Sequence, residues 1–497
     1  MKEKKEEVFI IKLPLKIEIW QQHILDNRFE YCREIYNCMR TKILRILSYY
    51  KNFKEWKEIE AITDYKQKNK LTQEFIKKYK LPFSEYGLGS YISKFLPRYK
   101  KYGINSTILE NISSNLWKSL EKYLYGKGKR ISYKEKDSFN SYKTRLKNGI
   151  FNGIQYDLKK AELTLNVNGK RGKNGKFMTI PFVINTKSEY EMFSFSANNE
   201  IREISIQREF IRGRWKYYVS FTIKGEKPNK GRELGKGNVG IDLGPSSVAI
   251  VSNENVYIDE LGKGIESIEK KLHKLLRKMD RSRRQNNPLQ FNENGTIKKY
   301  PKGERPNWIL TNNYIKLKNK VKELYRRKST LLKLSHINLA NEVIGYGNNF
   351  IVENNPVSAW AKRAKETTIN KKGKINKKKR FGKSITNHAP SMFIEILENK
   401  INSLGGKINK IDIRNAASQF DFTNGEKTKH QLNERRIKLS NGNTHLRDTL
   451  AAFNLQHFAN NKYNIDEMKK KYNKFCKLEQ IEINRHKGKK NLKSFGI

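Results

Sequence analysis

The order of apolar and polar positions predicts a strand, then helices, then strands in the first half of the chain. Residues 8–17 form an apolar run that reads as a strand and contains Pro14. From about residue 22 to 124, apolar positions recur with helical spacing, as in NISSNLWKSLEKYLYG. Strict alternation returns at 163–167 and 215–223, which is typical of strands. We therefore expect the first strand to join the later ones in one sheet, with the helices as an insertion.

The second half of the chain alternates strands and helices. Two apolar runs, 239–243 and 248–251, flank a Gly-Pro-Ser-Ser turn and predict a β-hairpin. A strongly basic segment with little apolar periodicity, 361–384, predicts a loop or a nucleic-acid clamp. The other predicted elements are helices at about 265–284, 313–345 and 390–404, strands at 348–355 and 407–416, and a last clear helix within HLRDTLAAFNLQHF.

Three carboxylates stand out because each lies within or beside an apolar run. Asp242 lies inside the first run of the hairpin, Glu353 ends an apolar triplet, and Asp448 lies at the start of the last predicted helix. Any one of them has an ordinary explanation, such as a paired arginine or a helix cap. Together, acids from two strands and a helix can converge at a sheet edge and hold two Mg²⁺ or Mn²⁺ ions about 3.5–4 Å apart for phosphodiester hydrolysis.

The charge of the chain indicates a polyanionic partner. Lys and Arg number 103 and Asp and Glu 50 among 497 residues, a formal net charge of +53. The basic residues are spread along the chain among 11% aromatic residues, which suits nucleic acid better than a polybasic membrane anchor. Candidates for phosphate contact share one face of the 265–284 helix, with a solvated surface as the alternative: Lys274, Arg277, Lys278, Arg281 and Arg284.

Cysteine spacing and hydropathy argue against several other classes of protein. Cys32, Cys38 and Cys476 form no C-x-x-C pair, so neither a disulfide framework nor a zinc ribbon is expected. The N-terminal residues do not resemble a signal peptide, and no stretch approaches the roughly 20 apolar residues of a membrane span. We expect no membrane partner and a cytoplasmic protein that associates with the nucleoid when it is on DNA.

Three motifs in order resemble those of a RuvC nuclease domain, which has the RNase H fold. They are GIDLG with Asp242, FIVEN with Glu353 and HLRDTLAAFN with Asp448. Their style is similar to that of TnpB, the transposon-encoded RNA-guided nuclease, and of the related compact type V CRISPR effectors. LLRKMDRSRRQNNP also resembles the basic bridging helix of this family. The resemblance is strong over about 237–457 and rests mostly on element order over 1–235.

The resemblance implies a multidomain protein of α/β and α+β class. Residues 1–20 are expected to form the first strand of a strand-rich, barrel-like wedge domain, 21–150 an inserted helical recognition lobe, and 151–235 the rest of the wedge domain. Residues 236–460 are expected to form the RuvC domain. The polar and basic composition of residues 461–497 separately predicts a poorly ordered tail.

The same resemblance implies an RNA-guided DNA endonuclease that requires Mg²⁺. Asp242 would bridge two metal ions, and Glu353 and Asp448 would each complete the coordination of one. The partners would be a guide RNA, from a transposon end or a CRISPR array, and target double-stranded DNA. The family usually carries four ribbon cysteines between the second and third motifs, but residues 419–448 contain none. We therefore expect no zinc and a degenerate ribbon-like insertion at about 417–445, either retained or remodelled.

Other functions fit parts of this pattern. The first motif also resembles the phosphate hairpin of actin-like and heat-shock-chaperone ATPases, although no second Asp-x-Gly hairpin follows at a matching place. An RNA-guided DNA-binding protein that does not cut would share every motif. An unguided RNase H-like nuclease or transposase would lack a bound RNA, and a basic RNA-binding protein could carry the three acids for structural reasons alone.

Overall fold

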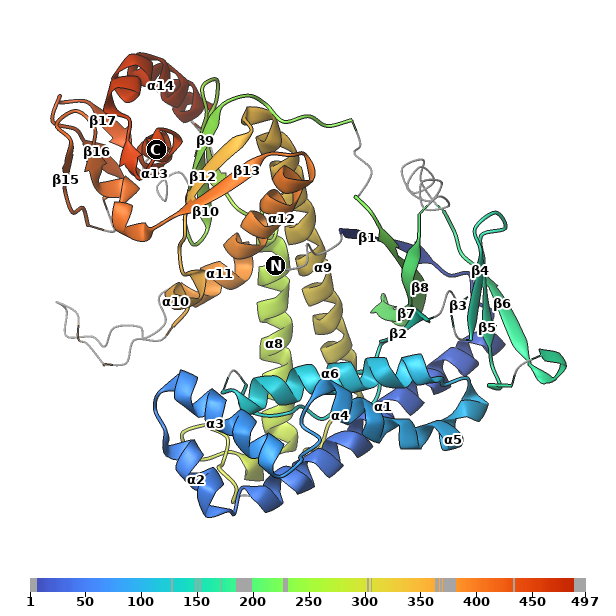
Figure 1. Cartoon of the computed structure of the whole chain (residues 1–497). Helices are drawn as coiled ribbons and strands as arrows, with labels where there is room; N and C mark the ends of the chain where they lie inside the picture. Colours follow the sequence, from blue (N-terminus) through green and yellow to red (C-terminus); the bar gives the residue numbers. More distant parts are fainter. Residues whose placement is uncertain are drawn as a thin grey trace. The chain divides into compact units, whose positions relative to one another are not determined.

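The computed structural model describes residues 7–126, 128–147, 150–151, 153–170, 172–184, 199–226, 231–301, 304, 306–362, 366, 369, 381–431 and 434–486. The chain divides into two compact units, Met1–Pro228 and Asn229–Ile497 (Figure 1). This division falls slightly before the boundary at residue 235 that the sequence predicts. Most of the basic segment 361–384 lies outside the described residues.

Within its described residues, the first unit combines strands with a set of helices. The strands are β1 (Val8–Pro14), β2 (Ser141–Lys147), β3 (Ile150–Phe151), β4 (Ile154–Asp157), β5 (Glu162–Asn166), β6 (Phe177–Pro181), β7 (Ile201–Ile211) and β8 (Arg214–Lys224). The helices are α1 (Ile19–Tyr50), α2 (Lys54–Ala61), α3 (Tyr65–Lys78), α4 (Glu85–Ile92), α5 (Leu96–Tyr99) and α6 (Ser106–Leu124).

The helices of the first unit are inserted into a sheet. β1 pairs antiparallel with β8 in a sheet of order β1-β8-β7-β2-β3, and β4, β5 and β6 form a second sheet. The expectation that the first strand joins the later ones is thus confirmed. The strands resume at Ser141, before the predicted start at residue 151. Among the β2 side chains that the structure describes, Tyr142 and Thr144 are the buried ones, and this short alternation gives little apolar signal.

Within its described residues, the second unit begins with a hairpin and ends with a long helix. Its strands are β9 (Asn238–Leu243), β10 (Ser247–Val251), β11 (Val256–Glu260), β12 (Asn349–Glu353), β13 (Lys407–Ile411), β14 (Phe420–Asp421), β15 (Glu426–Lys427), β16 (Arg436–Lys438), β17 (Thr444–Leu446), β18 (Phe458–Ala459) and β19 (Lys462–Tyr463). Its helices are α8 (Glu266–Asn286), α9 (Asn312–Val343), α10 (Val357–Trp360), α11 (Gly382–His388), α12 (Pro390–Ser403), α13 (Arg447–Gln456) and α14 (Ile465–His486).

A five-stranded mixed sheet of order β11-β10-β9-β12-β13 organises the second unit. β9, β10 and β11 are antiparallel neighbours, whereas β12 runs parallel to both β9 and β13. One face packs against α9 and α12 through a core that contains Ile241, Phe350 and Phe393. The other face packs against α13 and α14 through a core that contains Ile258 and Phe453. Figure 1 shows α13 and α14 on the opposite side of this sheet from α9 and α12.

The expected poorly ordered tail is wrong for residues 465–486, which form α14. Met468 and Phe475 are buried in the core beneath α13, and the acids Glu479 and Glu482 are buried with them. Composition did not predict this helix, because much of its buried face is polar. Those polar side chains form hydrogen bonds with other elements of the second unit. Residues 487–497 lie outside the described residues.

In its described residues, the segment that was predicted to be a ribbon-like insertion contains two small hairpins, and the carboxylate of Asp421 joins them. β14 pairs with β15 and β16 pairs with β17. Asp421 Oδ1 accepts hydrogen bonds from the Thr423 amide and hydroxyl, at 2.9 and 2.6 Å, and its Oδ2 accepts from the Ser440 amide and hydroxyl, at 2.8 and 2.9 Å. Charge-assisted hydrogen bonds of this kind are strong. They hold the two loops together without a metal-binding cysteine in either loop.

Candidate active site

Asp242 lies near the carboxyl end of β9, on the face of the sheet that α13 covers. Strand residues alternate between faces, and Ile241 and Leu243 point into the core with α9 and α12. Gly240 and Asp242 therefore point toward α13. A Cβ atom on Gly240 would lie 1.9 Å from the carbonyl oxygen of Ala452, so only glycine lets α13 approach this closely. The glycine thus sets the distance between the strand and the helix that carry two of the three acids.

Glu353 ends β12 and lies beside Asp242. The parallel register aligns Val352 with Ile241, so the next position of each strand carries an acid on the same face. Glu353 Oε1 accepts a hydrogen bond of 2.9 Å from the backbone amide of Ala417. This contact orients the carboxylate from the side of the ribbon-like insertion.

The amide that donates to Glu353 belongs to the turn at residues 416–420, which a side chain of α13 holds through two hydrogen bonds. Ala416 adopts a left-handed conformation with φ of +51°, which is strained for a residue other than glycine and costs about 1 kcal/mol or more. Asn454 is fully buried, and its Nδ2 donates to the carbonyl oxygens of Ala417 and Phe420, each at 2.8 Å. These two bonds hold the strained turn in place, so Asn454 supports the orientation of Glu353 through Ala417.

Asp448 lies in the first turn of α13. Ala451 and Ala452 on this helix are buried, and their small side chains permit its close packing on the sheet. Arg447 Nε and Nη2 both donate to Asp448 Oδ1, at 3.2 and 3.1 Å. Besides burial, the charge of Asp448 raises the pKa of Asp242, so Asp448 lies near the sheet edge that carries Asp242 and Glu353, and the Arg447 guanidinium lies beside it.

Asp242 is the acid that the other two carboxylates affect electrostatically. Burial, together with the charges of Asp448 and Glu353, raises the pKa of Asp242 well above its ordinary value, and Arg447 opposes this effect. Burial also raises the pKa of Glu353, although the Ala417 amide favours its ionised form. Because the raised pKa values disfavour the ionised carboxylates, a bound cation would stabilise their negative charge.

The donor chemistry of these acids fits Mg²⁺ or Mn²⁺, because both ions prefer oxygen ligands. Among the residues that the structure describes, however, no group of His, Cys, Asp and Glu is already assembled as a metal-ligand cluster. Arg447 contacts Asp448, and the Ala417 amide contacts Glu353. The metal site thus stays a prediction, and its formation would require these side chains to exchange protein contacts for metal contacts.

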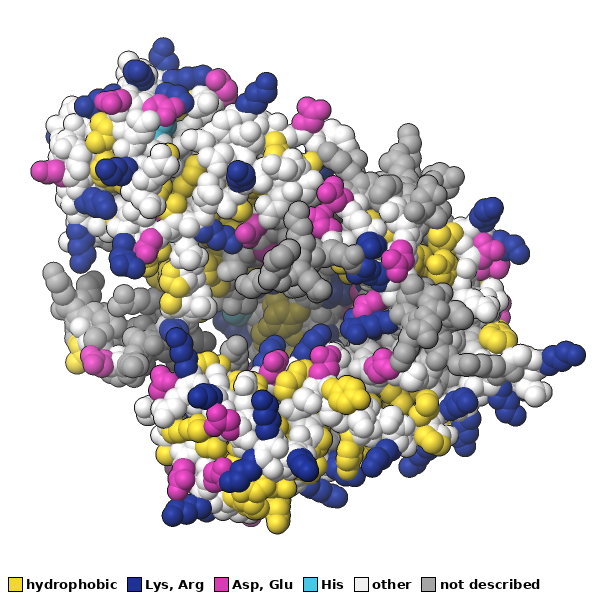
Figure 2. All heavy atoms as spheres, in the orientation of Figure 1, with side chains coloured by type: hydrophobic (Ala, Val, Ile, Leu, Met, Phe, Trp, Pro, Cys, Tyr) yellow, Lys and Arg dark blue, Asp and Glu magenta, His cyan; other side chains and the backbone are white. Residues whose placement is uncertain are grey.

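The five predicted phosphate-binding residues all lie on α8, and all have exposed side chains. Arg284 is engaged within the protein, since its Nε donates to Asp280 at 2.7 Å and its guanidinium lies 4.7 Å from the Phe291 ring centre. Lys274, Arg277, Lys278 and Arg281 project into solvent. Figure 2 shows that Lys and Arg side chains are scattered over the face in view and are not confined to one patch.

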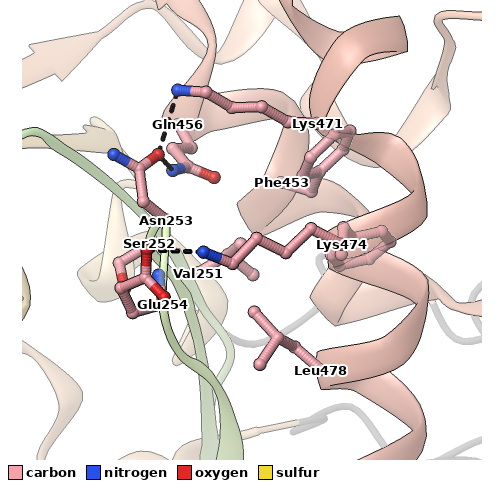
Figure 3. Close-up of a pocket in the computed structure, with 10 residues that line it drawn as sticks. Val251, Ser252, Asn253, Glu254, Phe453, Gln456, Lys471, Lys474 and Leu478 are labelled. Atoms are coloured by element: carbon pink, nitrogen blue, oxygen red, sulfur yellow. Dashed lines mark hydrogen bonds and ion pairs between the residues drawn. The ribbon is translucent and has the colours of Figure 1, made fainter.

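A cavity of about 240 Å³ lies between the β10–β11 turn, α13 and α14 (Figure 3). It is at the opposite end of β10 from the three acids. Lys471 Nζ donates to Asn253 Oδ1 at 3.0 Å, Gln456 Nε2 donates to the same oxygen at 3.0 Å, and Lys474 pairs with Glu254. The polar groups at the rim of this cavity therefore form hydrogen bonds and an ion pair with one another. Another cavity, of about 220 Å³, is lined by Glu353 together with Leu243 and residues of α12, and neither Asp242 nor Asp448 is among its lining residues.

Sequence reasoning missed the residues that support the acids. Asn454 and Arg447 lie inside the motif HLRDTLAAFN, so they could have been proposed from the motif. Nothing in the sequence signals that Ala417 contacts Glu353, because the contact is made by a backbone amide 64 residues away.

None of the helices in the described part of the chain is long and apolar enough to span a membrane. No family model matches the chain, and no curated protein matches its sequence. The structure is similar to Cas12f1 in a cryo-EM structure of a Cas12f1–sgRNA–target DNA complex, with 14% identity and a TM-score of 0.50 over 91% of this chain and 99% of that chain. This likeness confirms the mixed α/β multidomain fold that the resemblance to compact type V effectors implies.

Two further similarities are more distant. A chain of a CRISPR-Cas12f ternary complex matches with 14% identity and a TM-score of 0.30, over 90% of this chain and 83% of that chain. A Cas12i1 R-loop complex, captured before target DNA cleavage, matches with 9% identity and a TM-score of 0.27, over 80% of this chain and 53% of that chain.

Proposed function

We propose that this chain is an RNA-guided DNA endonuclease with a single RuvC-type site. The observation that carries the proposal is that Asp242, Glu353 and Asp448, from three motifs in RuvC order, share one sheet edge, where burial and the charges of Asp448 and Glu353 all raise the pKa of Asp242. The strand order β11-β10-β9-β12-β13 supports an RNase H fold for the second unit. The similar Cas12f1 structure, which contains sgRNA and target DNA, supports the same class of partner.

In this proposal the three carboxylates would hold two Mg²⁺ ions. Bound there, the ions would activate water and stabilise the leaving oxygen of a phosphodiester. β9 and β12 supply rigid positions for Asp242 and Glu353, and the first turn of α13 supplies Asp448. The Arg447 guanidinium beside Asp448 can turn to a phosphate oxygen when the carboxylate binds metal, because arginine binds both groups in the same geometry.

A guide RNA and double-stranded target DNA are the proposed partners, and the cytoplasm and its nucleoid are the proposed location. The net charge of +53 matches a polyanionic ligand, and release of counterions from nucleic acid would contribute to its binding. Guide–target pairing would supply sequence specificity while the protein contacts the shape of the heteroduplex.

The experiment is to purify the chain from cells that express its genomic neighbourhood, sequence the RNA that copurifies, and offer matched DNA with Mg²⁺. A specific RNA and guided cutting are expected. Cutting that is independent of RNA would indicate an unguided nuclease, and ATP turnover without nucleic acid would indicate an ATPase. A scrambled DNA target is the control, because a guided nuclease should leave it uncut. A protein that only binds RNA should cut neither the matched nor the scrambled target.

An RNA-guided DNA-binding protein that does not cut is the second candidate. The contact of Arg447 with Asp448, one of the three proposed metal ligands, favours it. Guided binding without cleavage in Mg²⁺ or Mn²⁺ would identify this function.

The exposed cations of α8 give a separate prediction. Replacing Arg277 and Arg281 with alanine should weaken nucleic-acid binding equally across sequences and lower the slope of log K against log salt by about 2, because each contact releases about one counterion. Fluorescence anisotropy over a salt series measures the slope. The matched control replaces Lys469 and Lys477, exposed on α14, and should leave the slope unchanged. Equal slopes for both double variants would show that the α8 cations are only solvated.

A further inference from the structure

Glu479 on α14 is a buried carboxylate that forms hydrogen bonds with residues around the start of α13. It is 4% exposed. Its Oε1 accepts hydrogen bonds from the Leu446 amide, at 3.1 Å, and from the Thr449 hydroxyl. Its Oε2 lies 2.6 Å from His445 Nδ1, and Tyr472 holds the other nitrogen of that imidazole at 2.7 Å. A buried acid is stable only when its oxygens are satisfied in this way.

The contact supplies a cap that α13 lacks in its own sequence. The N-cap residue of α13 is Leu446, whose side chain cannot accept a hydrogen bond from the first turn. In a capping box, the third helical residue reaches back to the N-cap amide. Here that residue is Thr449, whose hydroxyl contacts the Leu446 carbonyl oxygen and Glu479 instead. Glu479 takes the place of the missing acceptor, and its charge is favourable at a helix N-terminus.

We infer that Glu479 is a positioning residue for Asp448, so that α14 is part of the nuclease apparatus. Asp448 lies between Leu446 and Thr449, the two residues that Glu479 holds. Without this cap the first turn of α13 can fray, and the carboxylate of Asp448 loses its fixed place relative to Asp242. The inference rests on the proposed function and adds a residue that no motif contains.

The same helix offers a matched control. Glu482 is 5% exposed and lies less than one turn further along α14. Its Oε1 accepts a hydrogen bond of 2.9 Å from the Ile258 amide in β11, the edge strand of the sheet. Replacing Glu482 therefore removes an equally buried carboxylate with a backbone partner, but one that does not contact α13.

The test compares Glu479→Ala with Glu482→Ala in the full chain loaded with its RNA. The readouts are the Mg²⁺ concentration for half-maximal single-turnover cleavage, the affinity for target DNA, and the melting temperature. Both variants should melt lower than wild type and bind target normally. Only Glu479→Ala should require about tenfold more Mg²⁺, because loss of a group that orients a metal ligand typically costs that much.

A conservative variant separates positioning from burial. Glu479→Gln keeps the Oε1 acceptor, and His445 can exchange its tautomer to accept from the new amide. This variant should therefore recover a nearly wild-type Mg²⁺ requirement. If Glu479→Ala does not fold, Thr449→Val removes one of the same bonds without changing side-chain shape, and a raised Mg²⁺ requirement is expected.

Three results would overturn the inference: an unchanged Mg²⁺ requirement in Glu479→Ala, or in Thr449→Val where that variant replaces it; an equal rise in Glu482→Ala; or no recovery in Glu479→Gln. These results differ from failure of the proposed function, which would appear as a wild-type chain that cuts no guided target at any Mg²⁺ concentration and would remove both proposals.

Discussion

Replacing Asp242 with alanine is expected to abolish Mg²⁺-dependent cleavage of guided DNA, with a loss of at least about a thousandfold, equivalent to about 4 kcal/mol of barrier. Burial and the charges of Asp448 and Glu353 all raise the pKa of Asp242. In the proposed two-metal site Asp242 would be the ligand that both ions share, and its removal would leave them without it. Guide and target binding should remain nearly intact, since the change is confined to one side chain at the sheet edge. Single-turnover cleavage and filter binding of the same samples measure the two effects.

The control for this variant is Asp259→Ala. Asp259 is 6% exposed on β11 of the same sheet, where it pairs with Lys263 rather than with Glu353 or Asp448. This variant should lose stability and retain cleavage. Undiminished cutting by Asp242→Ala would remove the RuvC assignment, whereas equal losses in both variants would indicate general damage to the sheet.

The raised pKa of Asp242 also predicts how the stability of the metal-free protein depends on pH. Because its pKa is raised in the folded state, mainly by burial and then by Asp448 and Glu353, folding favours the protonated acid. Stability from this group is therefore lost as pH rises from about 4, the ordinary value for aspartate, through the folded-state pKa. Asp242→Asn removes this titration, so its melting temperature at neutral pH should equal or exceed that of the metal-free wild type. Mg²⁺ should raise the melting temperature of wild type more than that of the variant.

The sequence was sufficient to predict the elements that carry the acids. Two apolar runs that flank a Gly-Pro-Ser-Ser turn predict β9 and β10, and a helix begins where the motif around Asp448 predicts it. Parallel pairing of β12 with β9 then places Glu353 beside Asp242, which is a consequence of sheet geometry and not of either segment alone. The assembly of the acids into a metal site stays a prediction.

Arg447 and Asn454 could have been proposed from the motif around Asp448, but Ala417 and Glu479 could not, because their contacts join distant parts of the chain through backbone atoms. The amide of Ala417 reaches Glu353, and the carboxylate of Glu479 reaches the amide of Leu446. Neither pair has a charge or apolar pattern that marks it in the sequence. A left-handed alanine such as Ala416 is similarly invisible, because alanine carries no preference for that conformation.

The tail was mispredicted for a related reason. The inward face of α14 contains Met468 and Phe475, but also Glu479, Glu482 and His486, all of them buried. From its sequence, a helix with acids on its buried face resembles a solvent-exposed helix. The difference shows only when its partners on β11 and α13 are known. Its polar contacts therefore specify where the helix docks, whereas its aromatic and aliphatic contacts supply most of the stability.

Replacing Phe475 with alanine is expected to lower the free energy of unfolding of the second unit by about 3–5 kcal/mol, the usual cost of removing a buried phenyl ring. Phe475 is 3% exposed, stacks on Phe453 of α13 with ring centres 4.4 Å apart, and lies 5.4 Å from the His445 ring. Urea denaturation measures the change. Ile481→Ala is the matched control, because Ile481 lies on the same helix with 64% of its surface exposed and should change stability by less than about 0.5 kcal/mol. Equal stabilities of the two variants would mean that α14 does not pack on α13, and Glu479 could then not hold the start of that helix.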